Sequence, residues 1–591
     1  MRARVTPTWR LLSLGVTLAG LSALAAPQVH GESFMVKVRP DTAPRASAPV
    51  ELLAARNEAV SFQVVIHGGD SGAQGVTARF DALEGPARIE SSQLTLYRQE
   101  LLDITRPSGG SGGPGPWPDA LIPAVDEVAG EARAAFPFDV PPKKARALWV
   151  DVLVPEDVPA GTYQGTVEVR AAGGFTARVP VVLTVVNALF PSTPSYPTAF
   201  GMESDFICEA HTGREDCGSD DVLVELTGRY ARLALDHRFT LSKLLVLVPK
   251  DGQWERFDAA YAPFLDGTAP TRLRGARMTS AQYMGPLEDQ AVASFVEHFA
   301  ERGWLARAFD YTADEPPLFT TFEALRTRAD ILETSAPGLV RMVTTSLPHA
   351  RNHGLEPLMS RMSVIIHHIA PTGIMDAGTP RTDYDTFLAR PGTSLWLYQS
   401  CGSHGCGFPL PAGQHWPSYM VDHPANLNRA MPWVVFLLHA SGETYYDTVA
   451  RLSTAWTDQR FYGGNGDGTL FYPGTPERIG GQSHVPLPSI RLKLLRAGVQ
   501  DYEWLMLVTR SGDPDFATQV ARELIPAPDR VPIDPAAFER ARARLIERAL
   551  ALGPPPAVRM AWHRALEALA GVAVAAMLPA RPSLWWASSG S

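Results

Sequence analysis

The chain has 591 residues, which is too long for one ordinary hydrophobic core, so two or more domains are expected. Its 49 glycines and 51 prolines indicate many turns, as in β-rich and barrel architectures. The formal charge of -9 comes without a basic block, which argues against a nucleic-acid partner because phosphate neutralisation needs clustered Lys and Arg.

The N-terminus has the pattern of an export signal. Three arginines precede an apolar run from Leu11 to Ala26, and Ala23-Leu24-Ala25 supplies the small residues that signal peptidase accepts. The run is too short for a comfortable membrane span, although an uncleaved anchor remains the alternative. We therefore expect residues 1–26 to be a bacterial signal peptide, and the mature protein to be secreted or periplasmic without stable membrane insertion.

Residues 32–188 are predicted to form a β-sandwich. Apolar residues alternate in "EAVSFQVVIHG" and in "ALWVDVLVP", and "PAGTYQGTVEVRAAGGFTARVPVVLTVV" has the pattern of a hairpin with its turn at Ala172-Gly173-Gly174. This length is normal for one sandwich. The segment Arg106–Asp119, "RPSGGSGGPGPWPD", has no periodicity and is expected to be a long flexible insertion.

Strand-like and helical patterns alternate after the proline-rich linker "NALFPSTPSYPT". The strand "TAFGMES", the helix "DDVLVELTGRYARLALDHR" and the strand "FTLSKLLVLV" begin the series. Such alternation implies βα units with parallel strands. Because no Gly-rich phosphate turn follows the first strand, we expect residues 195–512 to form a (β/α)8 TIM-like barrel rather than an open sheet. Residues 513–591 are predicted to be a helical C-terminal region that packs on the body.

The four cysteines lie in two close pairs. Cys208 and Cys217 are nine residues apart, and Cys401 and Cys406 are five apart. An even number in an oxidising compartment suggests two local disulfides, although three connectivities are possible. A zinc site with His211 or His404 is the alternative, but the C-x₂-C spacing of structural zinc sites is absent. No metal is therefore expected.

Two adjacent carboxylates, Asp314 and Glu315, end the predicted strand in "ARAFDYTADEPPLF". Pro316 and Pro317 stop the strand because proline donates no backbone hydrogen bond. Barrel enzymes carry their chemistry at the C-terminal ends of the strands, where this pair is expected to lie. The alternative is a solvated loop opening, for which Asp-Glu before Pro is also common.

Six segments carry a resemblance to a known family. They are "ELLAARNEAVSFQVVIHG", "VDVLVPEDVPAGTYQGTVEV", "DHR" at Asp236–Arg238, "DEP" at Asp314–Pro316, "GDGTLFYPG" at Gly466–Gly474 and "LKLLRAGVQDYEWLMLV". In this order they resemble glycoside hydrolase family 123 and its uncharacterised relatives, the domain-of-unknown-function family 4091. The resemblance covers nearly everything between the signal peptide and about Arg510.

The resemblance implies an exo-acting β-N-acetylgalactosaminidase-like glycosidase with a carbohydrate substrate. It would retain configuration by substrate assistance, in which the 2-acetamido oxygen of the sugar attacks the anomeric carbon. Asp314 would hold and polarise the acetamido N–H, and Glu315 would protonate the leaving oxygen and later activate water. The residues fit this chemistry, because neighbours in a strand point to opposite faces, whereas an ordinary retaining pair spans the bond at about 5 to 5.5 Å.

Substrate contacts are expected from polar and aromatic residues near the strand ends, since sugar sites use aromatic platforms and fixed polar groups. The candidates are Glu203, His367, Tyr398, Tyr446 and Trp456. A core position is the alternative for each aromatic, and only one of His367 and His368 can face the cleft. Glu203 and Asp205 are reserve carboxylates for an ordinary two-acid mechanism.

Several other motifs are interpreted as structural. "GGNGDGTLFYPG" lacks the terminal bidentate acid of a calcium loop and is predicted to be a turn. His237 and Arg238 precede a strand, which is the wrong end for catalysis. Arg496, Asp501 and Glu503 lie on a predicted helix and are expected to form structural ion pairs.

Two alternatives to the proposed activity remain open. One is a non-catalytic carbohydrate-binding or cell-surface protein with a barrel scaffold, and the other is a two-carboxylate glycosidase of different sugar specificity. No HExxH, P-loop, dinucleotide fingerprint or G-x-S-x-G elbow is present, so other common enzyme classes lack support and no cofactor is expected.

Overall fold

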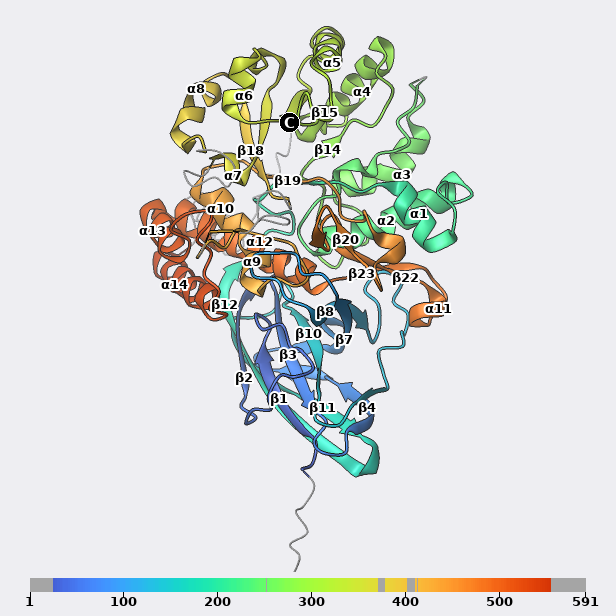
Figure 1. Ribbon diagram of the computed structural model, residues 1–591, viewed down its shortest axis with the longest axis vertical. Coiled ribbons are helices and arrows are strands. Elements are labelled where there is room, and N and C mark those ends of the chain that lie inside the picture. Colours follow the sequence, from blue (N-terminus) through green and yellow to red (C-terminus); the bar gives the residue numbers. More distant parts are fainter. Residues whose placement is uncertain (1–24, 251, 370–377, 401–409, 412, 554–591) are drawn as a thin grey trace, which may run out of the picture.

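The structure is a computed structural model that describes residues 25–250, 252–369, 378–400, 410–411 and 413–553. It has a β-sheet region at one end and a barrel with helices at the other (Figure 1). Most of the predicted signal peptide, the pair Cys401 and Cys406, and the chain after residue 553 lie outside the described residues.

Two packed sheets form the N-terminal region, as the alternating patterns predict. One has the strand order β1-β3-β10-β7-β8, and the other β2-β12-β11-β4-β9 with β5 and β6 beside it. The bounds in the first sheet are β1 (Gln28–Ser33), β3 (Ala59–His67), β10 (Ala145–Leu153), β7 (Leu94–Ile104) and β8 (Gly115–Pro123). Those in the second are β2 (Val50–Arg56), β12 (Phe175–Leu189), β11 (Gly161–Ala171), β4 (Ala73–Arg79), β9 (Phe138–Val140), β5 (Ala82–Glu84) and β6 (Arg88–Glu90).

The alternation in β3 and β10 separates two buried faces. Phe62 and Val64 of β3 and Val150 of β10 are in the core between the sheets. Ser61 of β3 and Asp151 of β10 have the opposite parity and are also buried, because this face meets the C-terminal domain rather than solvent.

The segment Arg106–Asp119 is not the long flexible insertion that its composition suggests. Strand β8 begins at Gly115 and pairs antiparallel with β7 from Ile104 to Tyr97. The amide and hydroxyl of Ser108 donate to Asp422 of the barrel domain at 2.8 and 2.5 Å. Contacts with a residue more than 300 positions away order this segment. The local sequence pattern could not predict such contacts.

Seven parallel strands form a nearly closed barrel in the order β13-β19-β18-β17-β16-β15-β14. Their bounds are β13 (Thr198–Phe200), β14 (Ala281–Gln282), β15 (Ala308–Ala313), β16 (Val340–Thr344), β17 (Arg361–Ile365), β18 (Ser394–Tyr398) and β19 (Glu443–Tyr445).

The eight-stranded expectation is met only in part. The predicted strand "FTLSKLLVLV" contributes one isolated bridge, between Leu241 and Phe200 of β13, and then a turn of 3₁₀ helix at Ser242–Leu244. Hydroxyl groups replace part of the strand ladder here: Thr240 N–H donates to Thr198 Oγ1 at 2.8 Å, and Thr279 N–H donates to Thr240 Oγ1 at 2.9 Å.

Helices surround the barrel and extend beyond it. The bounds are α1 (Ser204–Thr212), α2 (Asp220–Asp236), α3 (Glu255–Asp266), α4 (Asp289–Glu301), α5 (Phe322–Ser335), α6 (Leu347–Asn352), α7 (Ile366–Ile369), α8 (Asp385–Leu388), α9 (Ala425–Arg429), α10 (Met431–Leu437), α11 (Pro476–Ile479), α12 (Ile490–Arg510), α13 (Pro514–Leu524) and α14 (Ala537–Leu552). Two short hairpins, β20 (Arg460–Phe461) with β21 (Gly464–Asn465) and β22 (Phe471–Gly474) with β23 (Val485–Pro488), follow β19. None of the helices in the described part of the chain combines the length and apolarity that a membrane crossing requires.

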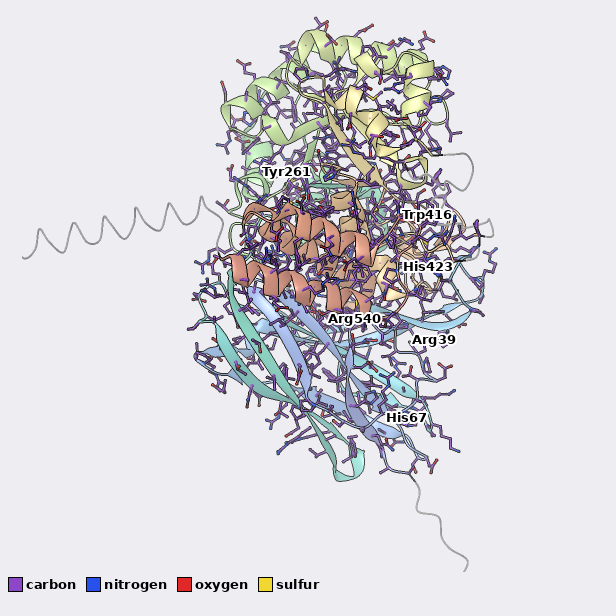
Figure 2. The ribbon with its side chains drawn as sticks, turned by 90° about the vertical axis from the view of Figure 1, so that its left-hand side faces the viewer. Arg39, His67, Tyr261, Trp416, His423 and Arg540 are labelled. Carbon is purple, nitrogen blue, oxygen red and sulfur yellow. A yellow bond between two sulfur atoms is a disulfide. The ribbon has the colours of Figure 1, made fainter. Side chains whose placement is uncertain are left out.

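Helix α12 joins the sandwich to the barrel. Lys493 and Arg496 on this helix donate to the buried Asp151 of β10 at 2.8 and 2.9 Å. Asp501, one turn further on, accepts two 2.7 Å hydrogen bonds from Arg429 of α9. The predicted structural ion pairing of Arg496 and Asp501 is thereby confirmed. Figure 2 shows the last described helices, with Arg540 on α14, in a layer between the sheets and the barrel.

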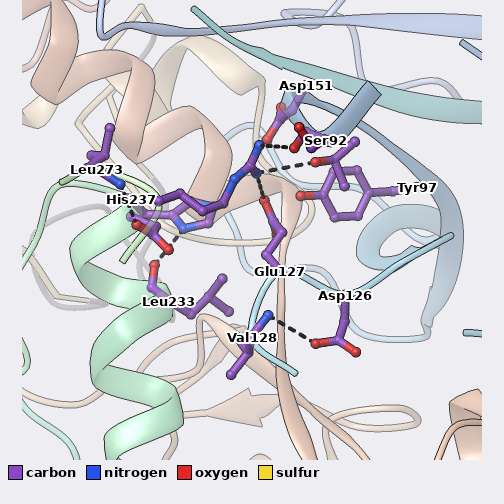
Figure 3. A network of polar contacts seen from close by, with 12 residues as sticks. Ser92, Tyr97, Asp126, Glu127, Val128, Asp151, Leu233, His237 and Leu273 are labelled. Atoms are coloured by element: carbon purple, nitrogen blue, oxygen red, sulfur yellow. Dashed lines mark hydrogen bonds and ion pairs between the residues drawn. The ribbon is translucent and has the colours of Figure 1, made fainter. Parts of the chain in front are cut away.

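A second polar group at this interface surrounds the guanidinium of Arg272. It donates to Glu127 Oε1 at 2.6 Å and to the backbone oxygen of Ser92 at 3.3 Å (Figure 3). His237 lies nearby, fully buried, with its Nδ1 2.7 Å from the backbone oxygen of Leu233. His237 thus has a buried position outside the candidate site, which fits the expected structural role, although the strand predicted after it contributes only one isolated bridge.

Cys208 on α1 and Cys217 form a disulfide, as the spacing predicts. The loop that it closes follows the first barrel strand and leads into α2.

Candidate active site

A cavity of about 490 Å³ opens at the C-terminal ends of the barrel strands. Gln282, Thr344, Tyr398 and Tyr445 are each the last residue of their strand, and all four line it. The full lining is Ala199, Gly201, Ser242, Lys243, Gln282, Phe309, Tyr311, Asp314, Glu315, Leu318, Phe319, Met342, Thr344, Tyr398, Ser400, Thr444, Tyr445, Tyr446, Tyr462 and Asp467.

Another cavity of about 490 Å³ lies between the sandwich and helices α12 and α14. The cations in its wall are paired with carboxylates: Arg542 with Glu58, and Lys493 and Arg496 with Asp151. Its walls belong to the domain interface, so we place the candidate chemistry in the barrel cavity.

Asp314 follows β15 directly, and its carboxylate is held at one oxygen. The hydroxyls of Tyr311 and Thr344 both donate to Oδ1, at 2.7 and 2.9 Å. The backbone N–H of Asp314 donates to Thr320 Oγ1 at 3.0 Å, which fixes the loop beyond the strand. These contacts orient the carboxylate and leave Oδ2 without a donor among the described residues.

Glu315 has a backbone conformation that non-glycine residues rarely adopt. Its φ is 37°, in the left-handed region, and such a residue costs of order 1 to 3 kcal/mol unless its surroundings hold it. Its N–H donates to Thr344 Oγ1 at 2.8 Å, and Tyr398 Oη donates to Oε1 at 2.5 Å. The surroundings therefore fix both backbone and side chain of Glu315.

The pKa of Glu315 is raised above its ordinary value. Burial is the main cause, and the neighbouring charge of Asp314 adds to it, while the hydrogen bond from Tyr398 acts in the opposite direction. A carboxyl group with a raised pKa keeps its proton closer to neutral pH, as a general acid requires.

The alternation of β15 explains how these residues come together. Phe309 and Tyr311 face the cavity, whereas Asp310 between them is buried on the other face and accepts two hydrogen bonds from Arg328 of α5, at 2.8 and 2.5 Å. Beyond the strand, the left-handed turn at Glu315 allows both neighbouring acids to reach the same cavity.

Two of the predicted substrate residues, Tyr398 and Tyr446, line the cavity. Glu203 does not line the cavity. Its carboxylate forms an ion pair with the ammonium group of Lys243, and Lys243 does line the cavity. Asp205 is exposed in the first turn of α1.

His367 and Trp456 lie elsewhere. His367 is buried on α7 beside His368, with ring centroids 4.3 Å apart, and does not line the cavity. Trp456 packs against Tyr472 and donates its indole N–H to the backbone oxygen of Pro473 at 3.1 Å. The expectation of a substrate-binding Trp456 is corrected, because its ring is part of a core cluster near the β22–β23 hairpin.

Sequence reasoning missed Tyr311, Thr344, Lys243 and Asp467. Asp467 lies in the segment predicted to be a turn, is fully buried, and accepts a 3.1 Å hydrogen bond from Tyr445. The sequence does place an acid between two glycines here, but the same pattern is typical of a tight turn without a binding role. Tyr311 has the same parity along the predicted strand as the candidate acid Glu315, so the strand pattern could have found it.

Comparisons with known proteins match both regions of the chain to one family. Residues 33–171 match the glycoside hydrolase 123 N-terminal domain, and residues 226–508 match the glycoside hydrolase 123 catalytic domain. No curated protein sequence matches the chain.

Similar solved structures include a family 123 glycoside hydrolase from Clostridium perfringens, studied for glycolipid glycan hydrolysis. It has 13% identity and a TM-score of 0.63, over 89% of this chain and 98% of that one. A family 39 glycoside hydrolase from Bacteroides cellulosilyticus WH2 has 11% identity and a TM-score of 0.28, over 72% and 80%. A Bacteroides ovatus GH5 xyloglucanase has 9% identity and a TM-score of 0.23, over 76% and 98%.

The match to the N-terminal domain precedes the match to the catalytic domain along one chain. The structure from Clostridium perfringens shares the fold over most of both chains. The chain therefore belongs to glycoside hydrolase family 123 and is a glycosidase.

Proposed function

We propose that the protein is an exo-acting β-N-acetylhexosaminidase, β-N-acetylgalactosaminidase-like, that retains configuration by substrate-assisted catalysis. The observation that carries the proposal is the pair Asp314 and Glu315 in one cavity at the strand ends, the first fixed by two hydroxyls and the second with a raised pKa. One carboxylate is suited to accept a hydrogen bond, and the other is suited to donate a proton.

In the first step the acetamido oxygen attacks the anomeric carbon while the bond to the leaving oxygen breaks. Glu315 gives its proton to that oxygen, and Asp314 Oδ2 accepts a hydrogen bond from the acetamido N–H as a protonated oxazoline forms. Since Oδ1 is already bound by Tyr311 and Thr344, Asp314 needs no reorganisation to do this. In the second step the ionised Glu315 takes a proton from water as the water oxygen bonds to the anomeric carbon. The bond from that carbon to the acetamido oxygen breaks, which opens the oxazoline ring and restores the acetamido group.

Asp467 supports a second candidate mechanism. It is a buried carboxylate in the wall of the same cavity, and an ordinary retaining glycosidase uses two carboxyl groups about 5 to 5.5 Å apart. In that mechanism Asp467 is the nucleophile and no acetamido group is needed.

The substrate decides between the two. Aryl 2-acetamido-2-deoxy-β-galactosides and β-glucosides are assayed beside the parent sugars without the acetamido group. Substrate assistance predicts cleavage of the acetamido sugars at least about 100-fold faster, and inhibition by a thiazoline analogue of the oxazoline. Equal turnover of both sets, with no inhibition, would support Asp467 as nucleophile and contradict the proposal.

Replacement of the acid tests its role. Glu315→Gln is expected to lower kcat/KM by about 10²- to 10⁴-fold, since the amide cannot donate a proton to the leaving oxygen. Glu301→Gln, at the exposed end of α4, is the matched control and should leave the rate unchanged. Full activity of Glu315→Gln would contradict the assignment.

We also propose that residues 1–26 are cleaved on export to the periplasm or beyond. The disulfide between Cys208 and Cys217 supports this, because disulfides persist in oxidising compartments. Mass spectrometry of the protein from its native bacterium should find an N-terminus near residue 27, and a chain that begins at Met1 would contradict the proposal.

A further inference from the structure

Large exposed apolar side chains gather at the mouth of the candidate active site. In the described part of the chain nine such side chains are exposed, and four of them line this one cavity: Leu318, Phe319, Tyr446 and Tyr462. Leu318 and Phe319 are 72% and 62% exposed, and Tyr462 is 64% exposed. Exposed apolar groups that cluster beside a cavity are typical of a binding surface.

Two of these residues belong to the turn that carries the proposed acid. The backbone N–H of Leu318 donates to the backbone oxygen of Glu315 at 2.7 Å and closes the turn, and Phe319 follows. Glu315 itself is half-buried, so the chain runs from the acid outward to the rim within four residues.

Aromatic rings form another part of the rim. Tyr446 follows β19, and Tyr462 lies in the turn of the β20–β21 hairpin, with ring centroids 6.0 Å apart. Phe461 packs on Tyr462 at 4.2 Å. These rings come from segments more than 100 residues away from the Glu315 turn, and both groups line the same cavity.

Polar groups occupy the less exposed wall. Asp467 is fully buried, Gln282 is 8% exposed, and the side chain of Lys243 is 19% exposed. The enclosed part of the cavity therefore offers polar groups to the hydroxyls of a sugar ring, beside the buried apolar Phe309 and Met342, while the large exposed side chains of the rim are apolar or aromatic.

An exo-acting enzyme encloses the sugar that it removes, and the leaving group extends from the glycosidic oxygen toward solvent. Since Glu315 must contact that oxygen, the leaving group passes the exposed residues of the same turn. We propose that Leu318 and Phe319, with Tyr446 and Tyr462, form a leaving-group subsite for an apolar aglycone, an alkyl or aryl group attached directly to the hydrolysed sugar. The inference rests on the proposed function and adds the chemical class of the leaving group.

The test uses methyl, butyl and hexyl 2-acetamido-2-deoxy-β-galactosides and β-glucosides, below their micelle concentrations. The reacting bond is alike in all of them, so differences in kcat/KM report contacts of the alkyl group with the protein. We expect kcat/KM to rise about two- to fourfold for each added methylene over the first carbons, because each methylene is removed from water at the rim. In a Leu318→Ser/Phe319→Ser double variant the ratio of hexyl to methyl rates should fall at least about fivefold.

Ile533→Ser is the matched control, since Ile533 is 51% exposed and does not line the cavity. It should leave both the rates and their ratio unchanged. Equal rates along the wild-type series, or an unchanged ratio in the double variant, would overturn the inference. A disaccharide cleaved faster than the hexyl glycoside would also overturn it, because the rim would then favour a sugar.

Failure of the proposed function gives a different result. If no 2-acetamido glycoside is cleaved, even with a methyl group, the proposed sugar is wrong. The same alkyl series is then run on the parent galactosides and glucosides. A kcat/KM that rises with the length of the alkyl group supports the apolar subsite, and a kcat/KM that does not change overturns it.

Discussion

Tyr398 opposes the rise in the pKa of Glu315. Its hydroxyl donates to Oε1 at 2.5 Å, and this hydrogen bond lowers a pKa that burial and the charge of Asp314 raise. The bond stabilises the ionised carboxylate more than the acid. Without it the carboxyl group would hold its proton to higher pH.

Tyr398→Phe is therefore expected to move the alkaline limb of the kcat/KM profile upward by about one to two pH units, since a hydrogen bond to a charged group is worth about 1.5 to 3 kcal/mol. The rate at the optimum should fall as well, because the side chain of the acid is less fixed. Tyr462→Phe, which removes a hydroxyl from the same cavity, should leave the limb in place. A limb that moves down in Tyr398→Phe would contradict the stated direction.

The acid pair could be predicted from the sequence because its signal is local. A strand pattern, two carboxylates and two prolines lie within a few residues and point to the end of a barrel strand. Thr344 reaches the pair only through the parallel register of β15 and β16, which pairs residues some 30 positions apart, whereas Tyr311 lies on β15 itself, three residues before Asp314. Trp456 was placed wrongly because an aromatic residue near a strand end has the same local pattern in a core as in a binding site.

Among the strands, β19 carries an unusual buried carboxyl group on the side opposite to the cavity-lining Thr444. Glu443 is its first residue, fully buried, and receives hydroxyl hydrogen bonds from Tyr419 at 2.6 Å and Tyr196 at 2.7 Å. Burial raises its pKa to about 8, despite the opposing effect of these two bonds. The folded protein therefore keeps a proton that the unfolded chain releases above its ordinary pKa near 4.5.

Because the unfolded state binds fewer protons in this window, Glu443 lowers the free energy of unfolding as pH rises from about 4.5 to about 8. The slope is at most about 1.4 kcal/mol per pH unit. Glu443→Gln mimics the protonated acid, so its stability relative to the wild type should increase with pH in urea titrations at pH 5 to 8. Asp236 and Asp447, whose pKa burial raises to about 7, contribute equally to both proteins.

The exposed Glu301→Gln should show no such trend relative to the wild type. A constant difference between Glu443→Gln and the wild type across this range would mean that Glu443 is ionised in the fold. The buried acid had no local signal in the sequence, because Tyr196 and Tyr419, whose hydroxyls bind it, lie 247 and 24 positions away.

At the level of the whole molecule, the sandwich and the barrel share buried charges. Asp151 of β10 accepts hydrogen bonds from Ser61 and Trp149 in the sandwich and from Lys493 and Arg496 of α12. The alternating strands predicted a sandwich, but they did not predict that its second face would be buried, because that depends on a helix more than 300 residues later. The domains are thus expected to unfold together.

Asp151→Asn tests this coupling. The substitution leaves the ammonium of Lys493 and the guanidinium of Arg496 buried without their main counter-charge, and breaking a buried ion pair costs about 3 to 5 kcal/mol. Urea denaturation followed by tryptophan fluorescence and by far-ultraviolet circular dichroism should show this loss in one transition with both probes. Asp221→Asn is the matched control, since its carboxylate is 96% exposed in a 3.5 Å pair with Arg256 and should contribute less than about 1 kcal/mol. If the wild type already unfolds in two transitions, and Asp151→Asn leaves their separation unchanged, the domains are stable apart and the shared charges do not couple them. If the stability loss of Asp151→Asn equals that of the control, the buried network does not stabilise the interface.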